Sequence, residues 1–253
     1  MANGPAFDDA VAIAHAHPAL GVGCHIVLTD GIPLAPPERI PGLLGPDGKT
    51  LRPSLIDFIQ ALLRGKITPA EIELEALLQI HKLQRAGIKI THLDTHKHTH
   101  LFPMVTQRLL ALAESNRIPA IRNPFEPAWS LALDQGNSTR RIAIKLMNRL
   151  RPGFDANLRS HAERITTTDG TVAISATGQL SAATLAEILD ALPPTGTYEL
   201  CCHPGYNDAD LDRVTTRLRA HRDIERNALL SKIPEALRQP NAPKLIHYGS
   251  LGQ

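Results

Sequence analysis

The sequence contains few of the features that mark specialised protein classes. Its three cysteines, Cys24, Cys201 and Cys202, are too few for a disulfide framework, and two of them are adjacent in an apolar run. We therefore expect reduced, buried thiols. No apolar stretch reaches the roughly 18 residues of a membrane span, and no basic and apolar leader pattern opens the chain. We expect a cytoplasmic protein with no transmembrane segment.

The chain also lacks an excess of charge and several common motifs. Its 27 Lys and Arg residues nearly balance 25 Asp and Glu residues, and basic residues do not cluster among aromatics, so nucleic-acid binding is not expected. The patterns Gly-x-Ser-x-Gly, Gly-x-Gly-x-x-Gly and Gly-x-x-x-x-Gly-Lys do not occur. Their absence argues against serine-hydrolase, dinucleotide-binding and NTPase functions.

The pattern that is present predicts an α/β protein. Short apolar runs alternate with longer stretches of helical period, over 253 residues with a hydrophobic fraction of 43%. The predicted strands are residues 20–28, 88–93, 119–122, 198–202 and 244–248. The predicted helices are residues 7–17, 54–64, 69–86, 104–115, 140–150, 182–192 and 211–237. We expect one domain, residues 1–253, with parallel strands whose C-terminal ends gather the functional residues.

Boundary signals support one helix in particular. Thr68 precedes Pro69, and Glu71 follows three residues after Thr68, which is the capping-box pattern. Gly87 then predicts the end of this helix. Residues 33–53 read as a long loop, and residues 123–137 and 151–178 as irregular or weakly β.

The most informative feature is a histidine cluster. The chain has twelve histidines, and four of them lie in the nine residues from His92 to His100, directly after a predicted strand. If this segment is extended, alternate residues face the same side, so Asp94, His96, His98 and His100 project together as a metal-ligand face. The alternative is an accidental or tag-like histidine run.

Three further side chains stand in or at the ends of predicted strands. His25 interrupts an apolar strand, and taken alone it is more typical of a hydrogen-bonded core histidine than of a ligand. His203 precedes a Pro-Gly turn and is either a general acid or a residue that caps the turn. Arg122 either binds a substrate or carboxylate, or is a surface arginine. A metal-activated water attacking an amide or ester is the simplest chemistry for this set.

With these residues in place, the sequence resembles the YdjC-like (ChbG/HpnK) family of carbohydrate deacetylases. The resemblance extends over nearly the whole chain, and the sequence motifs are more similar to those of the hopanoid-associated HpnK branch. It rests on Asn3-Gly4-Pro5-Ala6-Phe7, on residues 23–31 and 91–103, on Ala176-Thr177-Gly178, and on residues 199–208 with their Cys-His-Pro-Gly-Tyr block.

The resemblance implies a (β/α) barrel-like fold and a hydrolase that removes the acetyl group from N-acetylglucosamine units. It implies one divalent metal ion, Mg²⁺ or Zn²⁺, held by an Asp and two His. By motif match, the metal ligands are His25 and His96. The implied substrate is an N-acetylated amino sugar, a chitooligosaccharide or a glycosyl hopanoid lipid, and a homodimer is the expected assembly.

The same motif match implies the remaining roles. His203 is the catalytic acid, and Asp94 and Arg122 support catalysis. His98 and Tyr206 are expected to contact substrate. The family's third ligand comes from an Asp-Asp-Phe-Gly motif on a first strand, and this motif does not occur in the sequence. We therefore expect an incomplete barrel that lacks the first strand and helix.

Three functions follow as hypotheses. The first is a metal-dependent deacetylase, inactive if the missing carboxylate is needed. The second is a non-catalytic remnant that binds metal or sugar. The third is an esterase or phosphatase in which His98 or His100 replaces the missing carboxylate.

Overall fold

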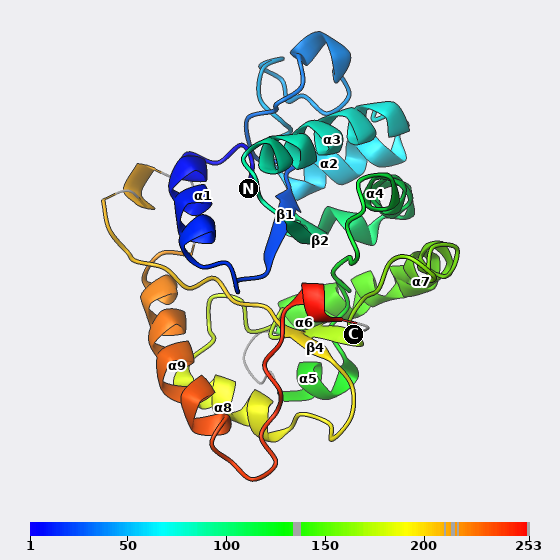
Figure 1. Cartoon of the computed structure of the whole chain (residues 1–253). Coiled ribbons are helices and arrows are strands. Elements are labelled where there is room, and N and C mark those ends of the chain that lie inside the picture. The colour runs from blue at the N-terminus through cyan, green and yellow to red at the C-terminus, as the bar shows by residue number, and fades with distance from the viewer. Residues whose placement is uncertain (134–137, 210, 214–215, 217, 252–253) are drawn as a thin grey trace. The chain divides into compact units, whose positions relative to one another are not determined.

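The computed structural model (Figure 1) describes residues 1–133, 138–209, 211–213, 216 and 218–251. The chain divides into two compact units. Unit 1 comprises Met1–Arg122, Leu150–Thr167 and Ile246–Gln253, and unit 2 comprises Asn123–Arg149 and Thr168–Leu245. Both units contain parallel strands and helices, which confirms the α/β class.

The sheet of unit 1 is built on two parallel strands. Strand β1 (Val22–Ile26) pairs with β2 (Ile90–Thr95), and the register sets Gly23 opposite His92 and His25 opposite Asp94. Isolated parallel bridges continue from β2 through residues 120–121 to residue 166. All residues of β2 except His92 are buried, which agrees with a strand covered on both faces.

Helices cover this sheet. Helix α3 packs against β1 and against α4, and α4 also packs against α7 (Figure 1). The helices of unit 1 are α1 (Phe7–Ala16), α2 (Leu55–Leu63), α3 (Pro69–Arg85), α4 (Pro103–Ser115) and α7 (Arg151–Arg159). Short 3-10 helices are η1 (Pro37–Arg39), η2 (His96–Leu101) and η5 (Tyr248–Ser250). Fully buried core side chains include Ile26, Phe58, Ile72, Ile80 and Leu93.

The predicted capping box of α3 is confirmed. The Thr68 hydroxyl accepts from the Glu71 backbone N–H, and the Glu71 carboxylate accepts from the Thr68 backbone N–H. Gly87 follows the end of the helix with φ of 75°, a conformation that glycine adopts at low cost. A capping box at the start of this helix and a glycine after its end therefore fix where it starts and stops.

Unit 2 has a smaller sheet and its own core. Strand β3 (Gly170–Val172) pairs in parallel with β4 (Tyr198–Leu200). Its helices are α5 (Ala128–Leu133), α6 (Ser138–Met147), α8 (Ala182–Asp190) and α9 (Ala220–Ala236), with the 3-10 helix η4 (Leu211–Arg213). A further 3-10 helix, η3 (Asn148–Leu150), begins in unit 2, and its last residue belongs to unit 1. Apolar residues between α8, α9 and β3, among them Val172, Leu185 and Ala228, form the core. None of the helices described in either unit is long and apolar enough to cross a membrane.

Several sequence predictions need correction. In the part of the chain that the structure describes, the named strands form two separate two-stranded sheets, so a barrel-like sheet is not seen there. Residues 119–122 form only single bridges, since Pro119 has no N–H to donate. Residues 151–178 contain the helix α7. Pro152 does not prevent this helix, because it lies in the first turn, where proline is tolerated.

Two predicted segments include residues outside the described ranges. The irregular segment 123–137 contains α5, and its residues 134–137 lie outside the description. The predicted helix 211–237 is a 3-10 turn followed by α9, which begins at Ala220, and its residues 214, 215 and 217 lie outside the description.

The predicted strand 244–248 is wrong. Leu245 is exposed, and the segment ends in η5, where the His247 ring accepts from the Gly249 N–H at 3.0 Å. The Tyr248 ring instead stacks on His92, with centroids 4.1 Å apart and an interplanar angle of 21°. A segment with strand propensity forms a strand only where a neighbouring strand can pair with it. This segment packs against His92 through the stacked Tyr248 ring instead.

A glycine of β1 makes this ring contact possible. A Cβ atom added at Gly23 would lie 2.3 Å from Cε1 and 2.4 Å from Nε2 of His92. We predict that Gly23→Ala lowers the free energy of unfolding by about 1–3 kcal/mol, because the ring is held between Gly23 and Tyr248 and overpacking costs that much. Urea denaturation measures this change.

The matched control is Gly45→Ala, where the nearest atom would lie at 3.4 Å, an ordinary contact. We expect a smaller loss there. In a His92→Ala background, Gly23→Ala should cost little, because the obstructing ring is gone. An equal loss with and without His92 would show that the contact is not the cause.

Candidate functional site

The register of β1 and β2 places four residues on one face of the sheet. Alternate residues of a strand face the same side, so Gly23 and His25 of β1 share a face with His92 and Asp94 of β2. Gly23 has no side chain, which leaves room for the His92 ring. Further along the strands, His25 lies opposite Asp94. Two predicted site residues from distant segments are thus brought together by strand pairing.

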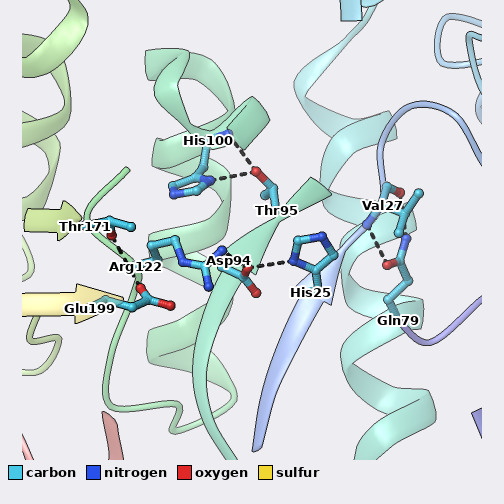
Figure 2. Close-up of polar contacts among 9 residues, drawn as sticks. All are labelled: His25, Val27, Gln79, Asp94, Thr95, His100, Arg122, Thr171 and Glu199. Carbon is cyan, nitrogen blue, oxygen red and sulfur yellow. Dashed lines mark hydrogen bonds and ion pairs between the residues drawn. The ribbon is translucent and has the colours of Figure 1, made fainter. Parts of the chain in front are cut away.

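Asp94 is the centre of this polar group. Its Oδ2 atom lies 2.6 Å from Nδ1 of His25, and the same oxygen accepts from Nη1 of Arg122 (Figure 2). The residue is 4% exposed. Burial alone raises the pKa of its carboxyl, but the charges of His25 and Arg122 and the His25 hydrogen bond outweigh it and hold the pKa well below its usual range. Asp94 is therefore an ionised carboxylate at neutral pH.

The segment after β2 is a turn, so the predicted extended histidine face is wrong. The strand ends at Thr95, and Lys97 and His98 both have φ of 53° within η2. Such left-handed conformations are uncommon for residues other than glycine and change the direction of the chain. His96 stays near His25, with ring centroids 5.7 Å apart and an interplanar angle of 75°.

The His100 side chain lies in the interior. It is fully buried, its Nδ1 atom lies 2.6 Å from the Thr95 hydroxyl, and its backbone N–H donates to the same hydroxyl (Figure 2). Burial, with a contribution from His98, holds the pKa of His100 well below its usual value. His98 is half-buried, with its ring centroid 6.1 Å from that of His100. His100 is therefore a neutral imidazole in the interior, and its role as a replacement ligand stays a prediction.

Two histidines have the chemistry of metal ligands. Asp94 engages Nδ1 of His25, which leaves Nε2 as the nitrogen for a metal, and a carboxylate behind a histidine is the usual support of a metal-ligating imidazole. Imidazoles bound to one tetrahedral ion through Nε2 have centroids roughly 5 Å apart, close to the separation of His25 and His96. Among the described residues, no three His, Cys, Asp or Glu side chains are grouped to hold a metal ion. The pair fits a metal, with the further donors still to be supplied.

Two other predicted site residues belong to unit 2. His203 follows β4, and its backbone N–H donates to the Glu225 carboxylate at 2.5 Å. Glu225 is 1% exposed and also accepts from Gly178, so one buried carboxylate ties together two of the sequence motifs. Tyr206 is 66% exposed, and the Arg226 guanidinium lies 4.7 Å above its ring. The roles of His203 and Tyr206 stay predictions.

The three cysteines are thiols and not disulfides, and two of the three are buried. Burial raises the pKa of the Cys24 thiol to about 12, so this thiol stays protonated and unreactive at neutral pH. Cys24 lies beside His25 in β1, where it packs in the core. These observations fit packing roles.

Sequence reasoning missed a row of polar side chains on α3. Glu71, Glu75 and Gln79 are all buried. Gln79 bonds both the N–H and the C=O of Val27 at 2.8 Å, immediately after β1 (Figure 2). Glu75 accepts from the N–H groups of residues 34 and 35, and Glu71 accepts from that of residue 42. Their spacing of four residues, which places them on one helix face, is the signal that could have found them.

Comparisons with known proteins agree on a family. A family model described as YdjC-like protein matches residues 1–239. A carbohydrate deacetylase of Brevibacillus brevis is 38% identical over 49% of this chain and 46% of the relative. A chitooligosaccharide deacetylase of Escherichia fergusonii is 31% identical over 59% of each chain. The matches therefore span less than two thirds of the length of these relatives.

A solved structure shares the fold. It is a protein of Enterococcus faecalis V583 named as a candidate cellobiose-phosphate cleavage protein. The likeness has a TM-score of 0.73 and 22% identity, and it covers 100% of this chain and 86% of that one.

Proposed function

This chain belongs to the YdjC-like protein family, and on that basis we propose that it is a metal-dependent carbohydrate deacetylase. The reaction is hydrolysis of the acetamide of an N-acetylglucosamine-type sugar. The observation that carries the proposal is the Asp94–His25 pair beside His96 at the ends of β1 and β2. A buried carboxylate that orients an imidazole next to a second imidazole is suited to holding a metal ion.

The metal ion would be bound by Nε2 of His25 and by His96. When bound, it supplies a water of lowered pKa and polarises the acyl carbonyl. Two imidazoles favour Zn²⁺ over Mg²⁺, which prefers oxygen ligands. Asp94 fixes the orientation of His25, and Arg122 keeps Asp94 ionised.

The remaining roles are part of the proposal. His203 donates a proton to the leaving amine as the general acid, since an imidazole near neutral pH can hold and release one. The Glu225 contact to its backbone fixes the turn that carries it. His98 and Tyr206 contact the sugar. For the substrate we propose a chitooligosaccharide, as in the name of the Escherichia fergusonii relative. A glycosyl hopanoid is the alternative, which the resemblance of the sequence motifs to HpnK favours.

A second candidate function is non-catalytic binding of metal or sugar. It is favoured by one observation, that the described residues contain no group of three metal-binding side chains. A metallohydrolase site normally has three protein ligands and one open position. Binding without turnover separates this candidate from the first.

The test is acetate release from N-acetylglucosamine oligomers with added Zn²⁺ or Mg²⁺. Two proteins are compared, the chain as printed and a version extended at the N-terminus with an Asp-Asp-Phe-Gly segment. We expect metal-dependent release from at least one of them, reduced roughly 10²-fold or more by His25→Ala or His96→Ala, because loss of a ligand removes the activated water.

The matched control is His17→Ala, an exposed histidine outside the site, which should leave release unchanged. Zinc binding without acetate release in either protein would favour the binding candidate. Neither zinc binding nor release would contradict the metal assignment altogether.

A further inference from the structure

We propose that Asp30 supplies a third ligand to the metal ion held by His25 and His96, and that Lys97 forms an ion pair with the Asp30 carboxylate when no metal ion is bound. The inference rests on the proposed metal-dependent function and adds one residue to it. Asp30 stands in the loop after β1, and Lys97 in the turn after β2. Both loops follow the strand ends that carry the two histidines.

The distances bring Asp30 to the metal-facing side of His96. Oδ2 of Asp30 lies 4.0 Å from Nε2 of His96 and 2.7 Å from Nζ of Lys97. Two ligand atoms on one tetrahedral zinc ion are about 3.4 Å apart. The gap between Asp30 and His96 is thus slightly too long for a hydrogen bond and slightly too long for a shared metal ion, and a small side-chain rotation closes it.

Both side chains are partly exposed to solvent. The His96 side chain is 27% exposed and the Asp30 side chain is 38% exposed. The Lys97 ammonium donates to the Asp30 carboxylate.

The backbone around Asp30 is held in an unusual conformation. Asp30 has φ of 57°, and its N–H donates to the Arg52 carbonyl at 2.8 Å. Lys97 has φ of 53°. Left-handed residues other than glycine persist only where surrounding contacts impose them, and they concentrate at functional sites. The two loops are therefore fixed in the positions from which Asp30 and Lys97 meet beside His96.

Metal binding and the Asp30–Lys97 ion pair compete in this arrangement. An ion that takes the Asp30 carboxylate must displace the Lys97 ammonium. Removing the carboxylate should therefore weaken metal binding, and removing the ammonium should strengthen it. A pair that merely clasps the two loops together would give a loss for both changes.

Isothermal titration of the whole chain with ZnCl₂ tests these signs. We expect Asp30→Asn to weaken zinc binding roughly tenfold or more, as loss of a supporting carboxylate does in zinc sites. Asparagine tolerates positive φ, so the loop conformation is kept. We expect Lys97→Met to strengthen binding about two- to fivefold, the range that loss of an exposed ion pair corresponds to. The double variant should match Asp30→Asn.

Asp47→Asn and Lys49→Met are the matched controls, because both residues are exposed and lie in the loop 33–53, away from the two histidines in the sequence. Neither should change zinc affinity. Equal losses in Asp30→Asn and Lys97→Met, or an unchanged affinity in Asp30→Asn, would overturn the proposal. If His25→Ala and His96→Ala abolish zinc binding while Asp30→Asn does not, only this inference fails. If the unaltered chain binds no zinc, the proposed function fails with it.

Discussion

Replacing Asp94 with asparagine should lower the free energy of unfolding by about 3 kcal/mol and weaken zinc binding roughly 10- to 100-fold. The first effect follows because the variant removes the Asp94 charge from its ion pair with the Arg122 guanidinium, which is 16% exposed, and breaking a buried pair typically costs 3–5 kcal/mol. The lower end applies because His25 is partly exposed. The second follows because Asp94 orients His25. Urea denaturation and zinc titration measure the two effects.

Asp47→Asn is the control for this change. Asp47 also has a lowered pKa, of about 2, because the Thr50 hydroxyl and the backbone N–H groups of residues 49 and 50 donate to it, but it lies on the surface. We expect an unchanged zinc affinity and little change in the unfolding midpoint. If Asp94→Asn behaved like Asp47→Asn, the buried carboxylate would not be the organiser of the site.

Replacing Glu75 with alanine should cost about 3–5 kcal/mol of stability. Glu75 has no exposed surface and accepts from the N–H groups of Leu34 and Ala35 at 3.0 and 2.8 Å and from Nε2 of Gln79 at 2.7 Å. The variant leaves these three donors without their acceptor, and each buried donor left unsatisfied costs about 1–3 kcal/mol. Thermal or urea denaturation measures the loss.

Glu73→Ala provides a control on the same helix. The Glu73 side chain is 49% exposed and lies 3.8 Å from the Arg108 guanidinium, so its loss should cost less than about 1 kcal/mol. If the two variants were equally destabilising, helix propensity and not the buried acceptor would explain the loss at Glu75. The prediction matters for function because Glu75 holds the loop after β1, which carries Asp30.

The sequence was sufficient to predict features that depend on near neighbours. The capping box at Thr68, the helix end near Gly87 and the polar end of β2 follow from local spacing and chain chemistry. The proximity of His25 and Asp94 could also be predicted, because the C-terminal ends of parallel strands lie at the same edge of a sheet.

Other features depend on contacts between distant segments and could not be predicted. Whether the chain turns after Thr95 depends on the Thr95–His100 bond and on burial of His100, neither of which the histidine spacing shows. Residues 248–250 form a turn in which the Tyr248 ring stacks on His92, more than a hundred residues earlier in the sequence. An apolar run alone does not distinguish such a contact from a strand.

The most direct test of the metal site is anomalous diffraction from crystals of the whole chain grown with Zn²⁺. We predict one strong zinc peak about 2.0–2.2 Å from Nε2 of His25 and of His96, with Oδ2 of Asp94 still bound to Nδ1 of His25. A peak held by other residues, or no peak beside His25 and His96, would contradict the assignment of these strand ends as the metal centre.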